Sequence, residues 1–308
     1  MFRTERDCFE FVVRSRWPED DFKCPSCGSS DTYTPKNRLA IICATCKHIQ
    51  SATAGTVMHG SRLPLSSWLL AAWLLVTDKR GISAKHLERT IGVSYETAYM
   101  MLQRLRAAMV NPQRDRLRGE VEVDESLIGG VKHGRRGKGT IGGKGGKFIA
   151  IGAVEIRRGT SSKTGEIVTR PGRLRLRHGE NLSGETLLRF VAKDIEPGTM
   201  VVTDGLKEYE PLPRMGYQHR IESTALGFPQ KEVLKHLHLA FANLKTWMAG
   251  TFHGRVEGKH LQGYLNEFCF RFNRRDNLVA AFQTILSIAP KIKAPTYSEV
   301  YTKKTGRV

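Results

Sequence analysis

Four of the six cysteines stand in two matched pairs, Cys24-Pro-Ser-Cys27 and Cys43-Ala-Thr-Cys46, with fifteen residues between the pairs. A C-x-x-C turn directs two thiolates toward one ion, and two such turns supply the four sulfur ligands of a tetrahedral Zn²⁺ site. The segment between the pairs has the length and the turn residues of a hairpin. Because four thiolates leave no open coordination position, the sequence predicts a structural zinc ribbon over residues 1–60.

Acidic residues form the second group that could do chemistry. The stretch "VEVDESLIGG" (121–130) has the alternation of a strand, which puts Glu120, Glu122 and Asp124 on one face. A second aspartate, Asp204, ends a later strand. Two carboxylates that meet bind hard divalent cations through oxygen, and a pair of Mg²⁺ ions can activate a hydroxyl and stabilise the leaving oxygen in phosphoryl transfer. A solvated strand face for Asp124 and a turn residue for Asp204 remain alternatives for each residue taken separately.

The elements that would position these aspartates alternate in a recognisable order. After the strand that carries Asp124 the pattern predicts strands at 147–156 and 172–180, a helix at 183–195 and a strand at 199–205. Three antiparallel strands, a helix and a further strand predict an α/β ribonuclease-H-like catalytic domain over residues 119–285. In that arrangement the strand ending at Asp204 lies beside the first strand, so that the two carboxylates meet.

A helical segment over residues 61–112 separates the ribbon from this domain. Ser83 would cap a short helix that ends at Gly92, and Ser94 would cap the next helix. The short link "IGVS" is typical of a helix-turn-helix that binds DNA, although a plain three-helix bundle would have the same pattern. The side chains expected nearest to DNA are Tyr95, Glu96, Tyr99, Arg104 and Arg106.

The charge of the chain favours a polyanionic partner. It has 49 Lys and Arg against 30 Asp and Glu, a formal charge of +19, which indicates nucleic acid. A Gly-rich basic stretch at 129–147 predicts a flexible loop on the phosphate backbone, and residues 286–308 predict a basic tail. The start of the chain does not fit a signal peptide, and the apolar run Trp68 to Val76 is too short to span a bilayer, so we expect a cytoplasmic protein with no membrane partner.

The cysteine pairs together with "VEVDESLIGG", "VVTDGLKEYEPL", "ANLKTWMAGTFHG" and "KHLQGYLNEFCFRFNRR" resemble bacterial insertion-sequence transposases of the Merlin-related group. Members of that group carry a zinc ribbon before a DDE-type, ISXO2-like transposase domain. The resemblance runs from about residue 20 to about residue 280. It implies an enzyme that cuts the ends of its element and joins them to target DNA, with Mg²⁺ or Mn²⁺, with double-stranded DNA as partner and usually as a homo-oligomer.

The same resemblance assigns catalytic residues. Asp124 matches the first catalytic aspartate and Asp204 the second. In DDE members a Glu precedes a helical Lys by seven residues, and counting back from Lys245 reaches His238; other members have Asn, for which Asn243 is the candidate. An amide oxygen can ligate Mg²⁺ whereas neutral His is a poor ligand, so we favour Asn243 and hold His238 second. Lys245 would contact a DNA phosphate, and further candidates for the missing carboxylate are Glu232, Glu257 and Glu267.

Two other functions stay open from the sequence. A non-catalytic regulator built from a zinc ribbon and a helix-turn-helix would account for the charge and for the N-terminal third of the chain. It would not account for two aspartates at the ends of strands further along the chain. A degenerate transposase that binds DNA without cutting would account for both, because the third carboxylate is missing.

Overall fold

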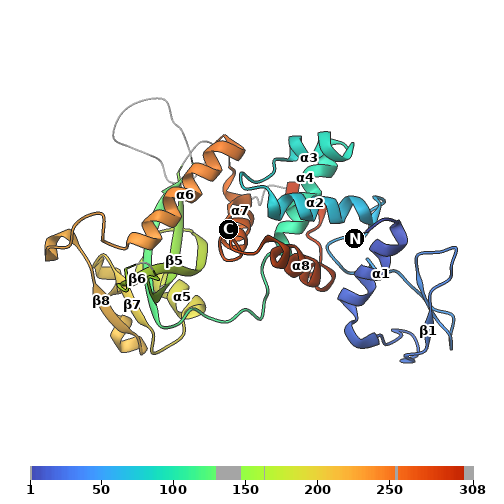
Figure 1. Cartoon of the computed structure of the whole chain (residues 1–308), viewed down its shortest axis with the longest axis horizontal. Coiled ribbons are helices and arrows are strands. Elements are labelled where there is room, and N and C mark those ends of the chain that lie inside the picture. The colour runs from blue at the N-terminus through green and yellow to red at the C-terminus, as the bar shows by residue number, and fades with distance from the viewer. Residues whose placement is uncertain (1, 130–146, 163, 254–255, 302–308) are drawn as a thin grey trace, which may run out of the picture. The chain divides into compact units, whose positions relative to one another are not determined.

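The computed structural model describes residues 2–129, 147–162, 164–253 and 256–301 of the 308-residue chain (Figure 1). The chain divides into two compact units. The first comprises Met1–Asn111 together with Asp276–Val308, and the second comprises Pro112–Arg275. The basic stretch expected to be a flexible loop lies almost entirely outside the described residues. Over the parts of the chain that are described, no helix is both long and apolar enough to cross a membrane.

The first unit opens with a helix and a small sheet. Helix α1 (Glu5–Arg16) starts at Thr4, whose side chain accepts from the backbone N–H of Asp7 while the Asp7 carboxylate accepts from that of Thr4. A 3₁₀ turn η1 (Pro18–Asp20) follows. Three short antiparallel strands then pair in the order β1-β2-β3. Their bounds are Thr32–Tyr33, Ile41–Cys43 and Ile49–Gln50.

Three helices follow the small sheet, and both predicted N-caps are confirmed. They are α2 (Leu65–Thr77), α3 (Ala84–Ile91) and α4 (Tyr95–Ala107). Ser83 accepts from the backbone N–H of His86, and Ser94 from that of Thr97. Gly92 ends α3 in the left-handed conformation, at φ 70°, where a side chain would be strained. The link "IGVS" therefore forms the tight turn between α3 and α4 that its residues indicate.

The segment after residue 275 also belongs to the first unit. It contains α8 (Leu278–Ile288), the 3₁₀ turn η5 (Ala289–Lys291) and α9 (Tyr297–Tyr301). The sequence predicts 276–285 as part of the second domain and 286–308 as a basic tail. Instead, the apolar side of α8 packs against α2, with the rings of Trp73 and Phe282 5.2 Å apart, and Val57 donates to the carbonyl of Ala289. The physical reason is that α8 has buried apolar residues to cover, even though the residues after it are polar.

The second unit is built on a five-stranded mixed sheet with the order β6-β5-β4-β7-β8. β5 is antiparallel to both β4 and β6, whereas β7 runs parallel to β4 and β8 parallel to β7. All the strands and the helix expected for this unit are present, with β5 and β6 longer than predicted. The strand bounds are Glu120–Ile128, Phe148–Thr160, Ile167–Gly179, Met200–Thr203 and Gln218–Ile221 for β4 to β8.

Helices cover both faces of this sheet. α6 (Lys235–Phe252) and α7 (Gly258–Phe272) enclose one core, which includes Leu237, Leu244 and Leu265, and α5 (Gly184–Asp194) covers the other. The 3₁₀ turns of this unit are Lys207–Tyr209 (η2), Leu212–Met215 (η3) and Thr224–Leu226 (η4).

Gly152 sets how closely α6 approaches the sheet. It lies on β5 directly opposite Asp124, and a Cβ placed there would be 2.7 Å from the ring of Phe241 and 2.9 Å from Leu237. Only a residue without a side chain admits α6 at this distance. The helix therefore lies against β5 at the position directly opposite Asp124.

Candidate metal and active sites

The four paired cysteines converge in the first unit. Their sulfur atoms all lie within 4.8 Å of one another, and the distances Cys24 to Cys46 and Cys27 to Cys43 are both 3.6 Å. Four sulfurs at about 2.3 Å from a tetrahedral Zn²⁺ would be roughly 3.8 Å apart, which is close to the spacing of this cluster. Backbone N–H groups, first that of Cys46, lower the pKa of Cys43 to about 6, which favours the thiolate that binds zinc.

The two halves of the cluster repeat one local structure. Gly28 donates its backbone N–H to the carbonyl of Cys24, and Lys47 donates in the same way to Cys43, four residues back in each case. Both donors have a positive φ, 74° and 61°. Strand β2 ends at Cys43 and pairs with β1, which folds one turn onto the other. The predicted hairpin is therefore present, and it positions the sulfurs.

The two aspartates lie at the same end of neighbouring strands in the second unit. β4 and β7 are parallel, with Glu122 beside Val202, and each aspartate comes two residues later. Asp124 is half-buried and Asp204 is exposed. Asp204 Oδ1 also accepts from the backbone N–H of Leu206 at 3.1 Å, so it does shape the turn after β7. Because this contact uses only Oδ1 of Asp204, Oδ2 can still bind a ligand.

His238 is the residue of α6 that contacts Asp124. Its Nε2 lies 3.0 Å from Asp124 Oδ2, and this hydrogen bond raises the pKa of His238. Asn243 and Lys245 are exposed further along the same helix, and Asn243 is displaced from His238 by about 7.5 Å along the axis. Within the described residues, only the four cysteines bring three or more His, Cys, Asp or Glu ligand atoms within 4.8 Å.

Glu122 holds the start of α6 against the sheet, a contact that the sequence did not reveal. Its carboxylate is 6% exposed and accepts from the backbone N–H of Leu237 at 2.7 Å. Burial raises the pKa of Glu122 to about 7, although the hydrogen bond from Leu237 opposes this. The N-cap residue, Leu234, starts the helix with φ 42° and no side-chain cap, so Glu122 supplies the acceptor from another element. Alternation had placed Glu122 on the correct face of β4, but nothing in the sequence connected it to residue 237.

A second missed contact supports the loop after Asp204. Tyr209, in the turn η2, donates its hydroxyl to Glu125 Oε2 at 3.2 Å, and both side chains lie on the face of the sheet opposite α6. Burial and then the neighbouring Asp124 raise the pKa of Glu125 to about 7. The loop is thereby attached to the strand that carries the other aspartate.

Three carboxylates considered as a replacement for the missing acid lie in other surroundings. Glu267 is fully buried in α7 and lies 3.6 Å from Arg271. Glu257 is 3.5 Å from Lys259 at the start of α7. Glu232 is exposed in the turn before α6. Glu267 in particular is not exposed to solvent.

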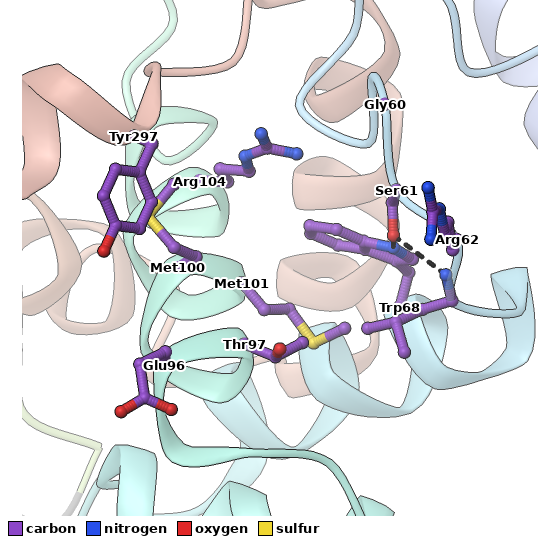
Figure 2. Close-up of a pocket in the computed structure, with 11 residues that line it drawn as sticks. Gly60, Ser61, Arg62, Trp68, Glu96, Thr97, Met100, Met101, Arg104 and Tyr297 are labelled. Carbon is purple, nitrogen blue, oxygen red and sulfur yellow. Dashed lines mark hydrogen bonds between the residues drawn. The ribbon is translucent and has the colours of Figure 1, made fainter.

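The start of α4 presents aromatic side chains, with one correction to the expected set. Tyr95 is 45% exposed and stacks on Tyr99, which also contacts Tyr301. Arg106, expected to bind phosphate, is instead 1% exposed in the helical core, because it lies on the side of α4 that packs inward. Arg104 donates to the carbonyl of His59. Figure 2 shows a pocket beside this helix, where Trp68 donates to Ser61 Oγ and Arg104, Met100 and Tyr297 form part of the lining.

An N-terminal zinc ribbon and a mixed sheet with helices on both faces are consistent with a DDE transposase. The comparisons agree: a family model described as "ISXO2-like transposase domain" matches residues 116–273, and one described as "transposase zinc-ribbon domain" matches residues 3–49. The chain belongs to the ISXO2-like transposase family. No curated protein matches the chain. The 116–273 match falls within the second unit, Pro112–Arg275, so the family domain and the compact unit coincide.

Proposed function

We propose that this transposase binds the double-stranded ends of its insertion sequence and catalyses metal-dependent cleavage and transfer of those strands into target DNA. The observation that carries the proposal is the parallel pairing of β4 with β7, which brings Asp124 and Asp204 to the same end of neighbouring strands. The sheet order, with the first strand central and the fourth parallel to it, supports a ribonuclease-H-like interpretation of the second unit.

In this proposal Asp124 and Asp204 hold Mg²⁺ or Mn²⁺, which would activate the attacking hydroxyl and stabilise the leaving oxygen. The third ligand comes from α6. Asn243 offers the amide oxygen that suits Mg²⁺, while His238 orients the Asp124 carboxylate through the 3.0 Å hydrogen bond. Lys245, exposed two residues further along the helix, contacts a phosphate of the bound strand.

The first unit would supply DNA binding. The zinc ribbon acts as a structural support, and α4 of the helix-turn-helix-like segment presents Tyr95 to the duplex. The charge of +19 supports an extended phosphate contact, and the joining of two ends to a target favours a homo-oligomer in the DNA complex.

The test is cleavage of an end-labelled duplex that carries the terminal repeat flanking the gene, with Mg²⁺ or Mn²⁺. We expect Asp124→Asn and Asp204→Asn to lower the cleavage rate roughly a thousandfold, the size of several kcal/mol of lost cation stabilisation, while gel-shift affinity is retained. Glu210→Gln, a neutralised and exposed acid in the same loop as Asp204, is the matched control and should cut normally.

The same assay separates the two residues of α6. Asn243→Ala should abolish cutting with both metals, whereas His238→Ala should weaken it and be rescued in part by His238→Gln, which restores a hydrogen-bond donor to Asp124. The opposite pattern would make His238 the third ligand. Tight binding by the wild type without cleavage under either metal would instead favour a DNA-binding relic or regulator, because neither His238 nor Asn243 is a carboxylate.

A further inference from the structure

Strands β5 and β6 continue beyond the five-stranded sheet. β4 pairs with β5 only as far as Glu155, whereas β5 and β6 remain paired from Ile156–Pro171 to Thr160–Ile167. We call residues 156–160 and 167–171 the β5–β6 arm. Because an isolated two-stranded ribbon is marginally stable, an arm of this length needs support from its own contacts or from a partner.

One face of the arm is attached to the rest of the second unit. Arg158 forms an ion pair with Glu120, and Thr169 Oγ1 lies 2.9 Å from His236 Nε2 at the start of α6. At the base of the arm, Arg275 donates to the carbonyl of Pro171 at 2.7 Å. These contacts hold the arm against the second unit and provide partners for the face that carries Arg158.

The opposite face carries an unfavourable pair. Arg157 and Arg170 are direct cross-strand partners, and both are exposed. Like charges directly opposite on an antiparallel pair destabilise it. No acidic side chain forms an ion pair with either arginine in the described part of the chain. Gly172 leaves room for this arrangement, because a Cβ there would lie 3.0 Å from Arg157 Nε.

An anion placed between the two guanidinium groups would turn this repulsion into attraction. Arginine binds phosphate through parallel N–H groups, and a two-stranded antiparallel ribbon fits the major groove of duplex DNA. A ribbon with arginines on its open face is therefore complementary to a phosphate backbone. Glu155, two residues before Arg157 on β5, already accepts from Arg173 and from the backbone N–H of Arg118, so its charge is matched by Arg173.

We infer that the open face of the β5–β6 arm, through Arg157 and Arg170, binds the phosphate backbone of duplex DNA. The inference rests on the proposed function, in which duplex DNA is the substrate, and adds a contact surface outside the two aspartates and α4. The contact is independent of base sequence, so it serves target DNA as well as the element's ends.

The first experiment measures affinity for a random-sequence duplex over a range of salt concentrations. We expect Arg157→Gln/Arg170→Gln to lower the slope of log K against log salt by about 2, since each lost phosphate contact removes about 1. The control Lys193→Gln/Arg214→Gln removes the same charge from exposed positions elsewhere in the second unit and should keep the wild-type slope. Equal slopes in the two double variants would overturn the inference.

The second experiment uses a change that acts in opposite directions on the free and bound protein. Arg157→Glu replaces the like-charged pair with an opposite-charged pair, so we expect a higher Tm in the free protein and a weaker affinity for DNA. A lower Tm, or an unchanged affinity, would contradict the assignment.

The outcomes separate this inference from the proposed function. A wild type that binds no duplex DNA would overturn both. A wild type that binds and cuts, with an unchanged salt slope in the arm variant, would overturn the arm alone. If the wild type is a dimer and the arm variant a monomer while the salt slope stays constant, the partner of this face is a second copy of the chain and the DNA assignment is wrong.

Discussion

The two candidate metal sites differ in how they are built. The cysteine site draws all four sulfurs from residues 24–46, and two local turns are enough to bring them within 4.8 Å. The proposed acidic site would draw on Asp124, Asp204 and a residue of α6, which come from two strands and a helix that meet only in the folded unit. The structure of a site made from local turns depends mainly on its bound ion. The geometry of a site assembled from distant elements depends on the packing of the strands and helices that carry its residues.

The largest effect should come from removing zinc. Structural zinc contributes on the order of 10 kcal/mol to small domains, and strands of two or three residues cannot replace it. We expect a chelator, or Cys27→Ser, to abolish amide protection over β1 to β3 while the strands of the second unit keep theirs. Hydrogen exchange with mass spectrometry and zinc stoichiometry measure both.

Cys8→Ala is the control for that prediction, because Cys8 is a buried cysteine of α1 outside the cluster. It should retain one zinc ion per chain. Loss of amide protection across β4 to β8 on chelation would contradict this prediction, because it would show that the second unit also depends on zinc.

We expect an intermediate loss of stability from substitution of Glu122, which attaches the start of α6 to β4. Glu122→Ala leaves the buried backbone N–H of Leu237 without its acceptor, which costs up to about 3 kcal/mol of unfolding free energy. Glu122→Gln keeps an acceptor oxygen and should recover much of the loss. Urea denaturation of the second unit's transition measures the difference.

The control is Glu185→Ala, which removes an exposed carboxylate on α5 with a surface ion pair and should change the unfolding free energy by less than about 1 kcal/mol. We also expect Glu122→Ala to slow cleavage more than the stability loss explains, because α6 carries the proposed third ligand. Equal stability of the Ala variant and the wild type would mean that α6 is held by its core contacts alone.

The same contrast explains what the sequence could predict. The cysteine turns, the caps at Ser83 and Ser94 and the alternation around Asp124 are local patterns, and the structure confirms each of them. Each depends on a spacing of two to four residues along the chain. The sequence also predicts that the strand ending at Asp204 lies beside the strand that carries Asp124, and the pairing of β7 with β4 confirms this, but it does not predict β8.

Contacts between distant residues could not be predicted in this way. Glu122 accepts from residue 237 and Asp124 contacts His238, more than a hundred residues away in each case. The docking of α8 on α2 depends on which apolar surface the first unit leaves uncovered. Arg106 is buried, contrary to the prediction, because the neighbours of α4 determine which side of that helix packs inward. These features depend on packing, in which the partner is chosen by the fold and not by a local motif.

The smallest effect concerns the framework at the base of the sheet, where Glu155 accepts from Arg173 Nε at 2.9 Å and from the backbone N–H of Arg118 at 3.0 Å. Burial alone would raise the pKa of Glu155, but the bonds from Arg173 and Arg118 outweigh it and lower the pKa. A carboxyl with a lowered pKa in the folded protein stabilises it above the unfolded pKa and loses that contribution as the pH falls through the folded value. We therefore expect Glu155→Gln to cost about 1–2 kcal/mol near neutral pH, with the gap to the wild type closing in acid. Urea denaturation as a function of pH measures the difference in unfolding free energy between the variant and the wild type. If that difference stays constant down to acid pH, Glu155 acts through packing and not through its charge. This part of the sheet would then be as insensitive to protonation as an apolar core.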